Sequence, residues 1–166
     1  MRSALLLLGG DQGDMEQTLD QAIELIERRV GRVARASSRY LTEPWGFSSE
    51  YPFTNQGLEV ATSLEAMELL DRLLDIEQQL GRDREQECKS KQTSGERYAS
   101  RMIDIDIILL GDEVINNERL TLPHPRMESR EFVLRPLAQI APCRVHPISG
   151  KSIEQLLKEI GDNVKE

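Results

Sequence analysis

Apolar positions recur along most of this chain with a period of two or of about 3.6, and each change of period marks a predicted element. Residues 3–8 read as a buried first strand, which we expect Gly9-Gly10 to end in a tight turn. Apolar residues at helical spacing follow, and they predict an amphipathic helix that Asp14 caps and that ends near Gly31. The chain is therefore expected to begin with a strand and a helix.

The next third of the chain repeats this alternation. Segments 32–42 and 53–62 have the pattern of strands, and leucines and isoleucines at helical spacing after Ser63 predict a second helix that stops at Gly81. Residues 82–100 are polar and show no periodicity, which predicts a long loop.

Residues 102–110 give the clearest strand signal, because apolar and mixed positions alternate strictly. We expect Gly111-Asp112 to turn the chain into a short returning strand at 114–115, followed by a short helix near 127–131 and a last helix capped by Ser152. One face of the strand would carry Ile103, Ile105, Ile107 and Leu109, and the other Met102, Asp104, Asp106, Ile108 and Leu110.

The order of these elements is strand, helix, strand, strand, helix, strand. This βαββαβ order predicts an α+β fold of the ferredoxin-like type, a sandwich with an antiparallel sheet, extended by a C-terminal hairpin and helices. No stretch rich in proline, glycine or serine separates two parts of the chain. We therefore expect residues 1–166 to form one domain.

Charge narrows the possible partners. The net charge is −8, which argues against a nucleic-acid binder, and the longest apolar run, residues 4–8, is far too short to cross a membrane. Arginine outnumbers lysine 16 to 5, and eight of the arginines lie between Arg82 and Arg135, which favours recognition of phosphate groups. We expect a cytoplasmic protein with no membrane contact, in which Cys88 and Cys143 are free thiols.

Asp104 and Asp106 are the strongest candidates for chemistry. Residues two apart on a strand point to the same face, so the two carboxylates would project side by side and could hold Mg²⁺ on ATP. The alternative is that both simply face solvent on an edge strand. Basic partners for phosphate would be Arg97, Arg101, His124 and Arg130.

Other familiar motifs are missing from the sequence. The glycine-rich start at residues 9–14 lacks the lysine of a phosphate loop, and a tight turn with a helix cap explains it better. Cys143 and His146 have no second ligand pair at zinc-site spacing, and no motif supports a nucleophilic serine or cysteine.

Four blocks of sequence occur in a diagnostic order, and together they are specific. On these residues the chain resembles the 6-hydroxymethyl-7,8-dihydropterin pyrophosphokinase family of folate biosynthesis, from the first strand to about Pro147. The blocks are YLTEPWG at 40–46 with FTN at 53–55, IE at 76–77 with GRDR at 81–84, RYASRMIDID at 97–106, and LPHPRM at 122–127 with REFVLRPL at 130–137.

This resemblance implies a reaction and a set of ligands. The terminal pyrophosphoryl group of ATP would pass to the hydroxymethyl group of the pterin, releasing AMP, with two Mg²⁺ ions on Asp104 and Asp106. Phe53 and Phe132 would sandwich the pterin, and Asn55 would hydrogen-bond its edge. Further substrate contacts implied by the resemblance are Thr42, Trp45 and Tyr98, the last standing where the family has tryptophan.

The resemblance also implies a phosphate-binding set and a nucleotide side. Segment 82–101 is expected to be a lid that closes over ATP. Its arginines would complete the catalytic set, which comprises Arg82, Arg84, Arg97, Arg101, Asp104 and Asp106. The nucleotide side would comprise Glu77, Arg84, Arg97, Ile107, Arg119, Thr121, His124 and Arg130.

Two other functions remain open from the residues alone. A two-metal nucleotidyltransferase or cyclase also places paired aspartates on ferredoxin-like strands, but it would release pyrophosphate instead of AMP. A ligand-sensing regulatory module could share the fold, although it would not need the aspartates and arginines together. The expected partners are ATP and a dihydropterin, and the expected oligomeric state is a monomer.

Overall fold

The computed structural model of the chain describes residues 1–10, 14–42, 53–89 and 103–164. No helix within these ranges is long and apolar enough to cross a membrane. The strands are β1 (Arg2–Gly10), β2 (Arg32–Ala36), β3 (Tyr40–Thr42), β4 (Phe53–Thr62), β5 (Asp104–Leu110), β6 (Ile115–Asn116) and β7 (Thr121–Leu122). The helices are α1 (Met15–Arg29), α2 (Ala66–Lys89), the 3₁₀ turn η1 (Met127–Ser129), α3 (Glu131–Ile140) and α4 (Ile153–Val164).

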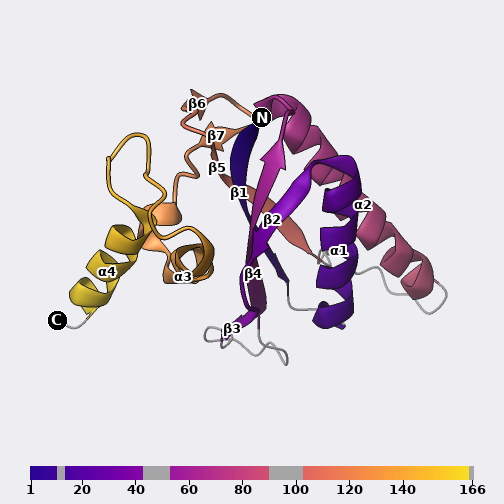
Figure 1. Cartoon of the computed structure of the whole chain (residues 1–166). Helices are drawn as coiled ribbons and strands as arrows, with labels where there is room; N and C mark the ends of the chain where they lie inside the picture. The colour runs from indigo at the N-terminus through magenta and orange to yellow at the C-terminus, as the bar shows by residue number, and fades with distance from the viewer. Residues whose placement is uncertain (11–13, 43–52, 90–102, 165–166) are drawn as a thin grey trace.

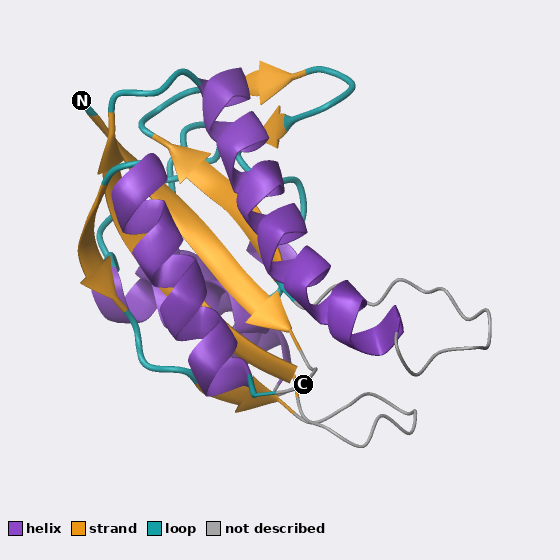
Figure 2. Cartoon of the chain, turned by 90° about the vertical axis from the view of Figure 1, so that its right-hand side faces the viewer, coloured by secondary structure: helices purple, strands orange, loops and turns teal. Residues whose placement is uncertain are grey.

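An antiparallel sheet with the strand order β2-β4-β1-β5 forms the middle layer, and β3 extends it by pairing with β4. Helices α1 and α2 cover one face, while α3 and α4 lie on the other side (Figure 1). Figure 2 shows α1 and α2 side by side across the sheet. This is the predicted ferredoxin-like βαββαβ arrangement, and it places β1 and β4 in the centre of the sheet.

Two apolar cores separate the three layers, as the alternation within β1 requires. Leu6 and Leu8 point into the core beneath α1 and α2, whereas Leu5 and Leu7 point into the core beneath α3 and α4. All four side chains are almost completely buried. A residue of β1 can therefore be assigned to a face from its place in this alternation.

Helix α2 is longer than the sequence pattern predicted. It continues through Gly81 to Lys89, so the expectation of a loop or lid starting at residue 82 is wrong for residues 82–89. A glycine inside a helix costs only about 1 kcal/mol, and the arginine, glutamate and glutamine residues that follow are good helix formers. A β-carbon at Gly81 would meet no described atom within 4 Å, so a residue with a side chain would also fit at this position.

Strand β5 contains a bulge that changes its faces. Leu5 pairs with Leu109 and Leu6 with Ile107, so Ile108 is an extra residue in the ladder. Leu109 therefore packs beneath α3 and α4 with Ile108, and Leu110 packs beneath α1 and α2. The predicted alternation holds as far as Ile108 and is wrong for Leu109 and Leu110.

Two other strands differ from the expected boundaries. β1 extends through Gly9 and Gly10, which pair with β4 instead of forming a turn. The segment 32–42 is divided into β2 and β3, because Ser37 hydrogen-bonds Gly57 through both its backbone N–H and its hydroxyl.

The C-terminal part follows its local signals with one correction. β6 pairs with β7 and so forms the expected hairpin, but it does not return along β5 among the described residues. The helix expected near 127–131 is the turn η1, and the apolar residues after it form α3. Ser152 and Gln155 cap α4 reciprocally, with N···O distances of 3.1 and 3.3 Å.

Candidate functional site

Asp104 and Asp106 project from the sheet face that α3 covers. They alternate with Ile105 and Ile107, whose side chains are buried beneath α1 and α2. Asp104 is half-buried and Asp106 is exposed. The two carboxylates therefore share one face of β5, as their spacing predicted.

Phe53 and Asn55 on β4 point to the same sheet face as Asp104 and Asp106, and β1 lies between β4 and β5. Gly9 pairs with Asn55 on β4 and with Asp104 on β5, so these three residues form one row across the sheet. The Asn55 side chain is buried, and its Nδ2 amide has no hydrogen-bond partner among the described residues. A buried amide donor costs free energy unless it is satisfied, so it is a candidate to bind a ligand with an acceptor atom.

His124 brings a third element to the carboxylate pair. Its backbone N–H donates to the Ile108 carbonyl oxygen at 2.9 Å, which joins the end of the hairpin to β5. Burial lowers the pKa of His124, the Asp106 carboxylate opposes this shift, and Arg130 and Arg126 add to it. Burial therefore favours the uncharged imidazole, and its Nδ1 accepts the backbone N–H of Arg126 at 3.2 Å.

Arg130 and Phe132 lie where α3 begins. The Arg130 guanidinium carbon is 5.5 Å from the centre of the Phe132 ring, a cation–π distance, so one face of the ring meets the guanidinium. Phe132 is 39% exposed, which leaves aromatic surface accessible. The beginning of α3 thus presents a cation and an aromatic ring on the side of the sheet that carries the aspartates.

Several residues that are expected to bind the nucleotide lie along the outer edge of β5. Glu77 on α2 accepts the Ile105 backbone N–H at 2.5 Å, and Arg119 pairs with Asp71 at 2.6 Å. Thr121 is half-buried on β7, which packs against β5. The Ile107 side chain is buried in the core beneath α1 and α2, so a ligand at this edge could meet only the Ile107 backbone.

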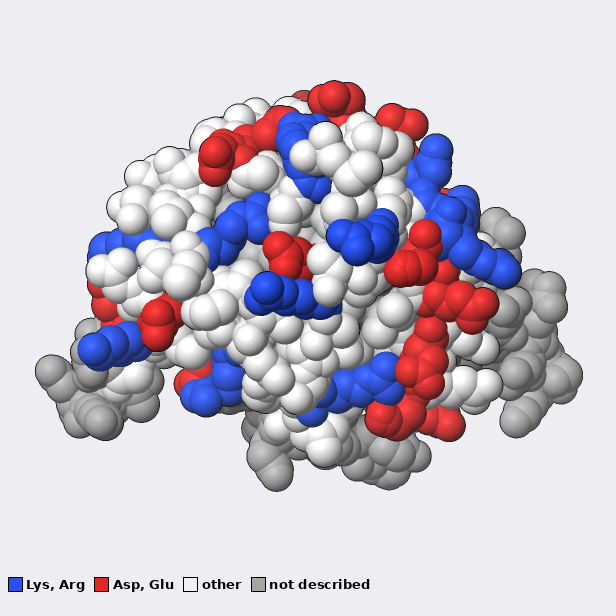
Figure 3. All heavy atoms as spheres, in the orientation of Figure 1, with Lys and Arg blue, Asp and Glu red and all other residues white. Residues whose placement is uncertain are grey.

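On the face shown in Figure 3, basic and acidic side chains are interspersed over most of the surface. A band of acidic side chains runs over α1, which carries Glu16, Asp20, Glu24 and Glu27. The acidic excess is thus carried in part by a helix on the face opposite to Asp104 and Asp106.

Comparison with known proteins identifies the family to which this chain belongs. The family model of 7,8-dihydro-6-hydroxymethylpterin-pyrophosphokinase (HPPK) matches residues 5–142. The chain belongs to this family. Its activity is pyrophosphoryl transfer to hydroxymethyldihydropterin in folate synthesis, which makes it a diphosphokinase, and the resemblance read from the sequence is confirmed.

Individual HPPK relatives agree along most of the chain. A 2-amino-4-hydroxy-6-hydroxymethyldihydropteridine pyrophosphokinase of Porphyromonas gingivalis is 38% identical over 148 residues, covering 89% of this chain and 95% of the relative. The enzyme of the same description from Bacillus subtilis is 41% identical over 138 residues, covering 82% and 77%.

A solved HPPK-DHPS structure from Plasmodium falciparum shows the same fold. It superimposes on 99% of this chain with a TM-score of 0.77 at 16% identity. The chain spans 46% of that longer protein. At this identity the likeness supports the α+β architecture alone.

Several expected HPPK site residues lie wholly or partly outside the described part of the chain. Trp45, Tyr98, Arg97 and Arg101 lie outside the described residues, and so does the part of the expected lid from residue 90 onwards. For three further residues only the backbone is described, namely Thr42 at the end of β3 and Arg82 and Arg84 in the last turns of α2.

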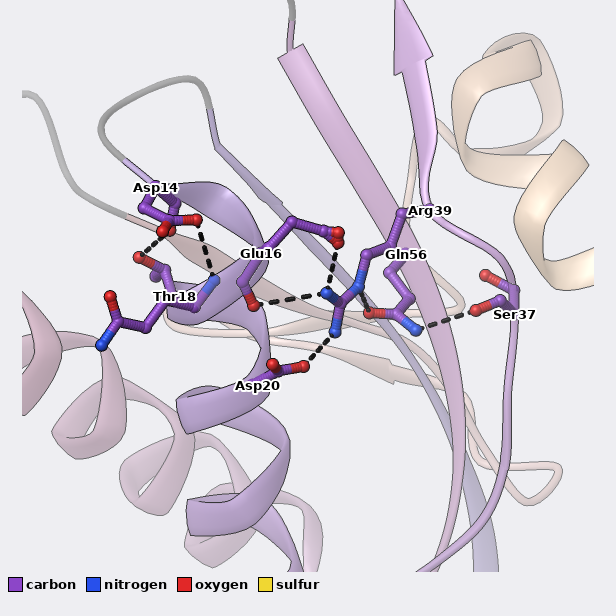
Figure 4. Close-up of polar contacts among 8 residues, drawn as sticks. Asp14, Glu16, Thr18, Asp20, Ser37, Arg39 and Gln56 are labelled. Carbon is purple, nitrogen blue, oxygen red and sulfur yellow. Dashed lines mark hydrogen bonds and ion pairs between the residues drawn. The ribbon is translucent and has the colours of Figure 1, made fainter.

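Arg39, which the sequence pattern did not single out, braces the end of β4 that carries Asn55. Its guanidinium bonds Glu16 and Asp20 at 2.7 Å and Gln56 at 3.0 Å, and the Gln56 amide donates to the Ser37 carbonyl oxygen at 2.8 Å (Figure 4). The network joins α1 to β4 at Gln56, whose side chain lies on the sheet face opposite to that of Asn55.

We expect Arg39→Met to lower the free energy of unfolding by about 1.5–3 kcal/mol, because it removes hydrogen bonds to charged groups from a mostly buried side chain. Urea unfolding measures this change. Arg28→Met is the matched control, since Arg28 meets Glu24 only at 4.0 Å on the exposed surface, and it should change stability by less than about 0.5 kcal/mol. Equal losses in the two variants would contradict a bracing role for Arg39.

Proposed function

We propose that the HPPK reaction of this chain takes place on the α3 side of the sheet, at the end where Gly9, Asn55 and Asp104 form a row. The donor is ATP, the acceptor is the hydroxymethyl oxygen of 6-hydroxymethyl-7,8-dihydropterin, and the products are its pyrophosphate ester and AMP. The orphaned, buried Nδ2 of Asn55, in the same row of the sheet as Asp104, is the observation that carries this proposal. Such a donor is suited to a heterocycle edge that offers acceptor atoms.

The donor set supports binding of Mg²⁺ with ATP. Asp104 and Asp106 offer carboxylate oxygens on one face, and the described residues contain no group of three acidic, histidine or cysteine side chains that could form an all-protein metal cage. Two carboxylates with open positions suit Mg²⁺, which keeps water and substrate phosphate oxygens in its shell. When bound there, two such ions would neutralise charge on the transferring phosphates.

The protein residues supply position and charge in the proposed reaction. Phe53 and Phe132 hold the flat pterin, and Asn55 fixes its edge, so the hydroxymethyl oxygen points towards the phosphates beside Asp104 and Asp106. That oxygen attacks the β-phosphorus and releases its proton to solvent water, the bond from this phosphorus to the oxygen that bridges it to the α-phosphorus breaks, and AMP leaves with that oxygen. Phosphoryl-type transfer depends mainly on such positioning and charge stabilisation.

The remaining candidate residues are assigned to ATP. Arg82, Arg84, Arg97 and Arg101 would bind phosphate oxygens, while Glu77, Thr121, His124 and Arg130 would meet the nucleotide along the outer edge of β5. His124 would act as a neutral hydrogen-bond donor through Nε2, because Nδ1 already accepts the Arg126 N–H. We also propose a monomer located in the cytoplasm, with ATP and the dihydropterin as its partners.

A product assay tests the reaction. The chain is incubated with ATP, Mg²⁺ and the reduced pterin, and nucleotides are separated by chromatography. We expect AMP and the pterin pyrophosphate ester in equal amounts, formed only when both substrates and Mg²⁺ are present. Release of free pyrophosphate with a nucleotidylated product would favour the nucleotidyltransferase alternative, and ADP would indicate transfer of a single phosphate.

A further inference from the structure

Gly9 occupies the middle position of the row that joins the two halves of the site. It pairs with Asn55 on one side and with Asp104 on the other. It also follows Leu5 and Leu7 in the alternation of β1, and both of these point towards α3 and α4. A side chain at position 9 would therefore project between the Asn55 amide and the Asp104 carboxylate.

The side chains proposed to bind the pterin, those of Asn55 and Phe53, occupy the space above Gly9. A β-carbon at this position would lie 2.5 Å from Asn55 Oδ1, 2.8 Å from Phe53 Cε1 and 3.2 Å from the Thr54 carbonyl oxygen. The first two distances are shorter than any normal contact, so the Asn55 amide and the Phe53 ring lean over the backbone of Gly9. The Thr54 backbone prevents the added carbon from moving away on that side.

Backbone conformation does not explain the glycine. Within the described residues, positive φ angles occur only at Gly111 and Gly150, so Gly9 has strand geometry that any residue could adopt. Gly57 shows the ordinary packing alternative, because a β-carbon there would meet Leu137 and Pro136 of α3. The neighbours of Gly9 are instead a buried amide and an aromatic ring from the candidate site.

We propose that Gly9 is a positioning residue for the pterin substrate. Its missing side chain lets Asn55 and Phe53 lie close to β1, which sets the direction of the orphaned Asn55 Nδ2 and keeps open the path from the pterin to Asp104. This inference rests on the proposed function, because it assumes that Asn55 and Phe53 bind the dihydropterin.

Gly9→Ala tests the inference by titration calorimetry with two probes. These are 6-hydroxymethyl-7,8-dihydropterin, and α,β-methylene ATP with Mg²⁺, which cannot transfer its pyrophosphoryl group. We expect the pterin Kd to rise about tenfold or more, since small displacements of positioning groups have large effects, and the nucleotide Kd to stay within about twofold. In steady-state assays, the KM for the pterin should rise by at least as large a factor as kcat falls.

Gly57→Ala is the matched control for a purely structural effect. It introduces the same methyl group on the same sheet face, with a closest contact of 2.9 Å to Leu137 Cδ2, but beneath the middle of α3. We expect both variants to lower the melting temperature and only Gly9→Ala to lose pterin affinity. If both variants lose pterin affinity in proportion to their loss of stability, Gly9 has a structural role and the inference is wrong.

A double-mutant cycle separates this inference from the proposed function. In an Asn55→Ala background the added methyl of Gly9→Ala has less to displace, so its effect on pterin Kd should shrink to less than about a third. Equal effects in both backgrounds would overturn the inference. Failure of the unmodified chain to bind the dihydropterin would overturn the proposed function itself, whatever the variants show.

Discussion

Turnover is expected to fall by about 10²- to 10³-fold in each of the single variants Asp104→Ala and Asp106→Ala. Each variant removes one carboxylate from the pair that faces the phosphates. Neither side chain is buried in a core, so the melting temperature should change little. Steady-state assays with saturating ATP, pterin and Mg²⁺ measure the loss.

Asp112→Ala is the matched control for these two variants. Asp112 is an exposed acidic residue just beyond the opposite end of β5, so its removal changes net charge equally without touching the pair. We expect nearly normal turnover in this control. If Asp104→Ala or Asp106→Ala kept normal turnover at ordinary Mg²⁺ concentrations, the assignment of the pair to the metal would be wrong.

Pterin binding is expected to weaken about tenfold or more in Phe132→Ala, since stacking of a flat heterocycle on an aromatic ring is worth about 1–3 kcal/mol. The ring is partly exposed and meets Arg130 on one face, so its removal leaves no cavity in the core. Titration calorimetry should show an affinity for α,β-methylene ATP that is nearly unchanged.

Ile148→Ala controls for the loss of exposed apolar surface. Ile148 is 67% exposed in the segment between α3 and α4 and is not one of the candidate site residues, so its removal should alter neither affinity. Equal losses of pterin and nucleotide affinity in Phe132→Ala would indicate a general defect of folding and would remove the support for the aromatic sandwich.

The sequence pattern predicted the strand and helix order because period and caps are local signals. Asp14 caps α1 through its side chain, and Ser152 with Gln155 caps α4, as expected. The errors lie where tertiary context decides. The bulge at Ile108 depends on how β5 pairs with β1. The continuation of α2 past Gly81 shows that a single glycine did not end the helix.

The candidate site was only partly visible in the sequence. The shared face of Asp104 and Asp106 follows from the two-residue repeat of one strand, so it could be predicted. The row of Asn55, Gly9 and Asp104 depends on the register of three strands that are far apart in the chain, which no local pattern contains. For the same reason Gly9 was interpreted as part of a turn, and the network around Arg39 was missed.

Paramagnetic broadening by Mn²⁺ tests most directly whether the chemistry lies where Gly9, Asn55 and Asp104 meet. Mn²⁺ takes the same oxygen ligands as Mg²⁺, so it can be added with α,β-methylene ATP to the ¹⁵N-labelled chain. We predict selective loss of the amide signals of Gly9, Asp104 and Asp106, with the signals of Leu110 and Gly111 retained at the opposite end of β5. Broadening centred on Leu110 and Gly111, with Gly9 and Asp104 unaffected, would contradict the proposed site.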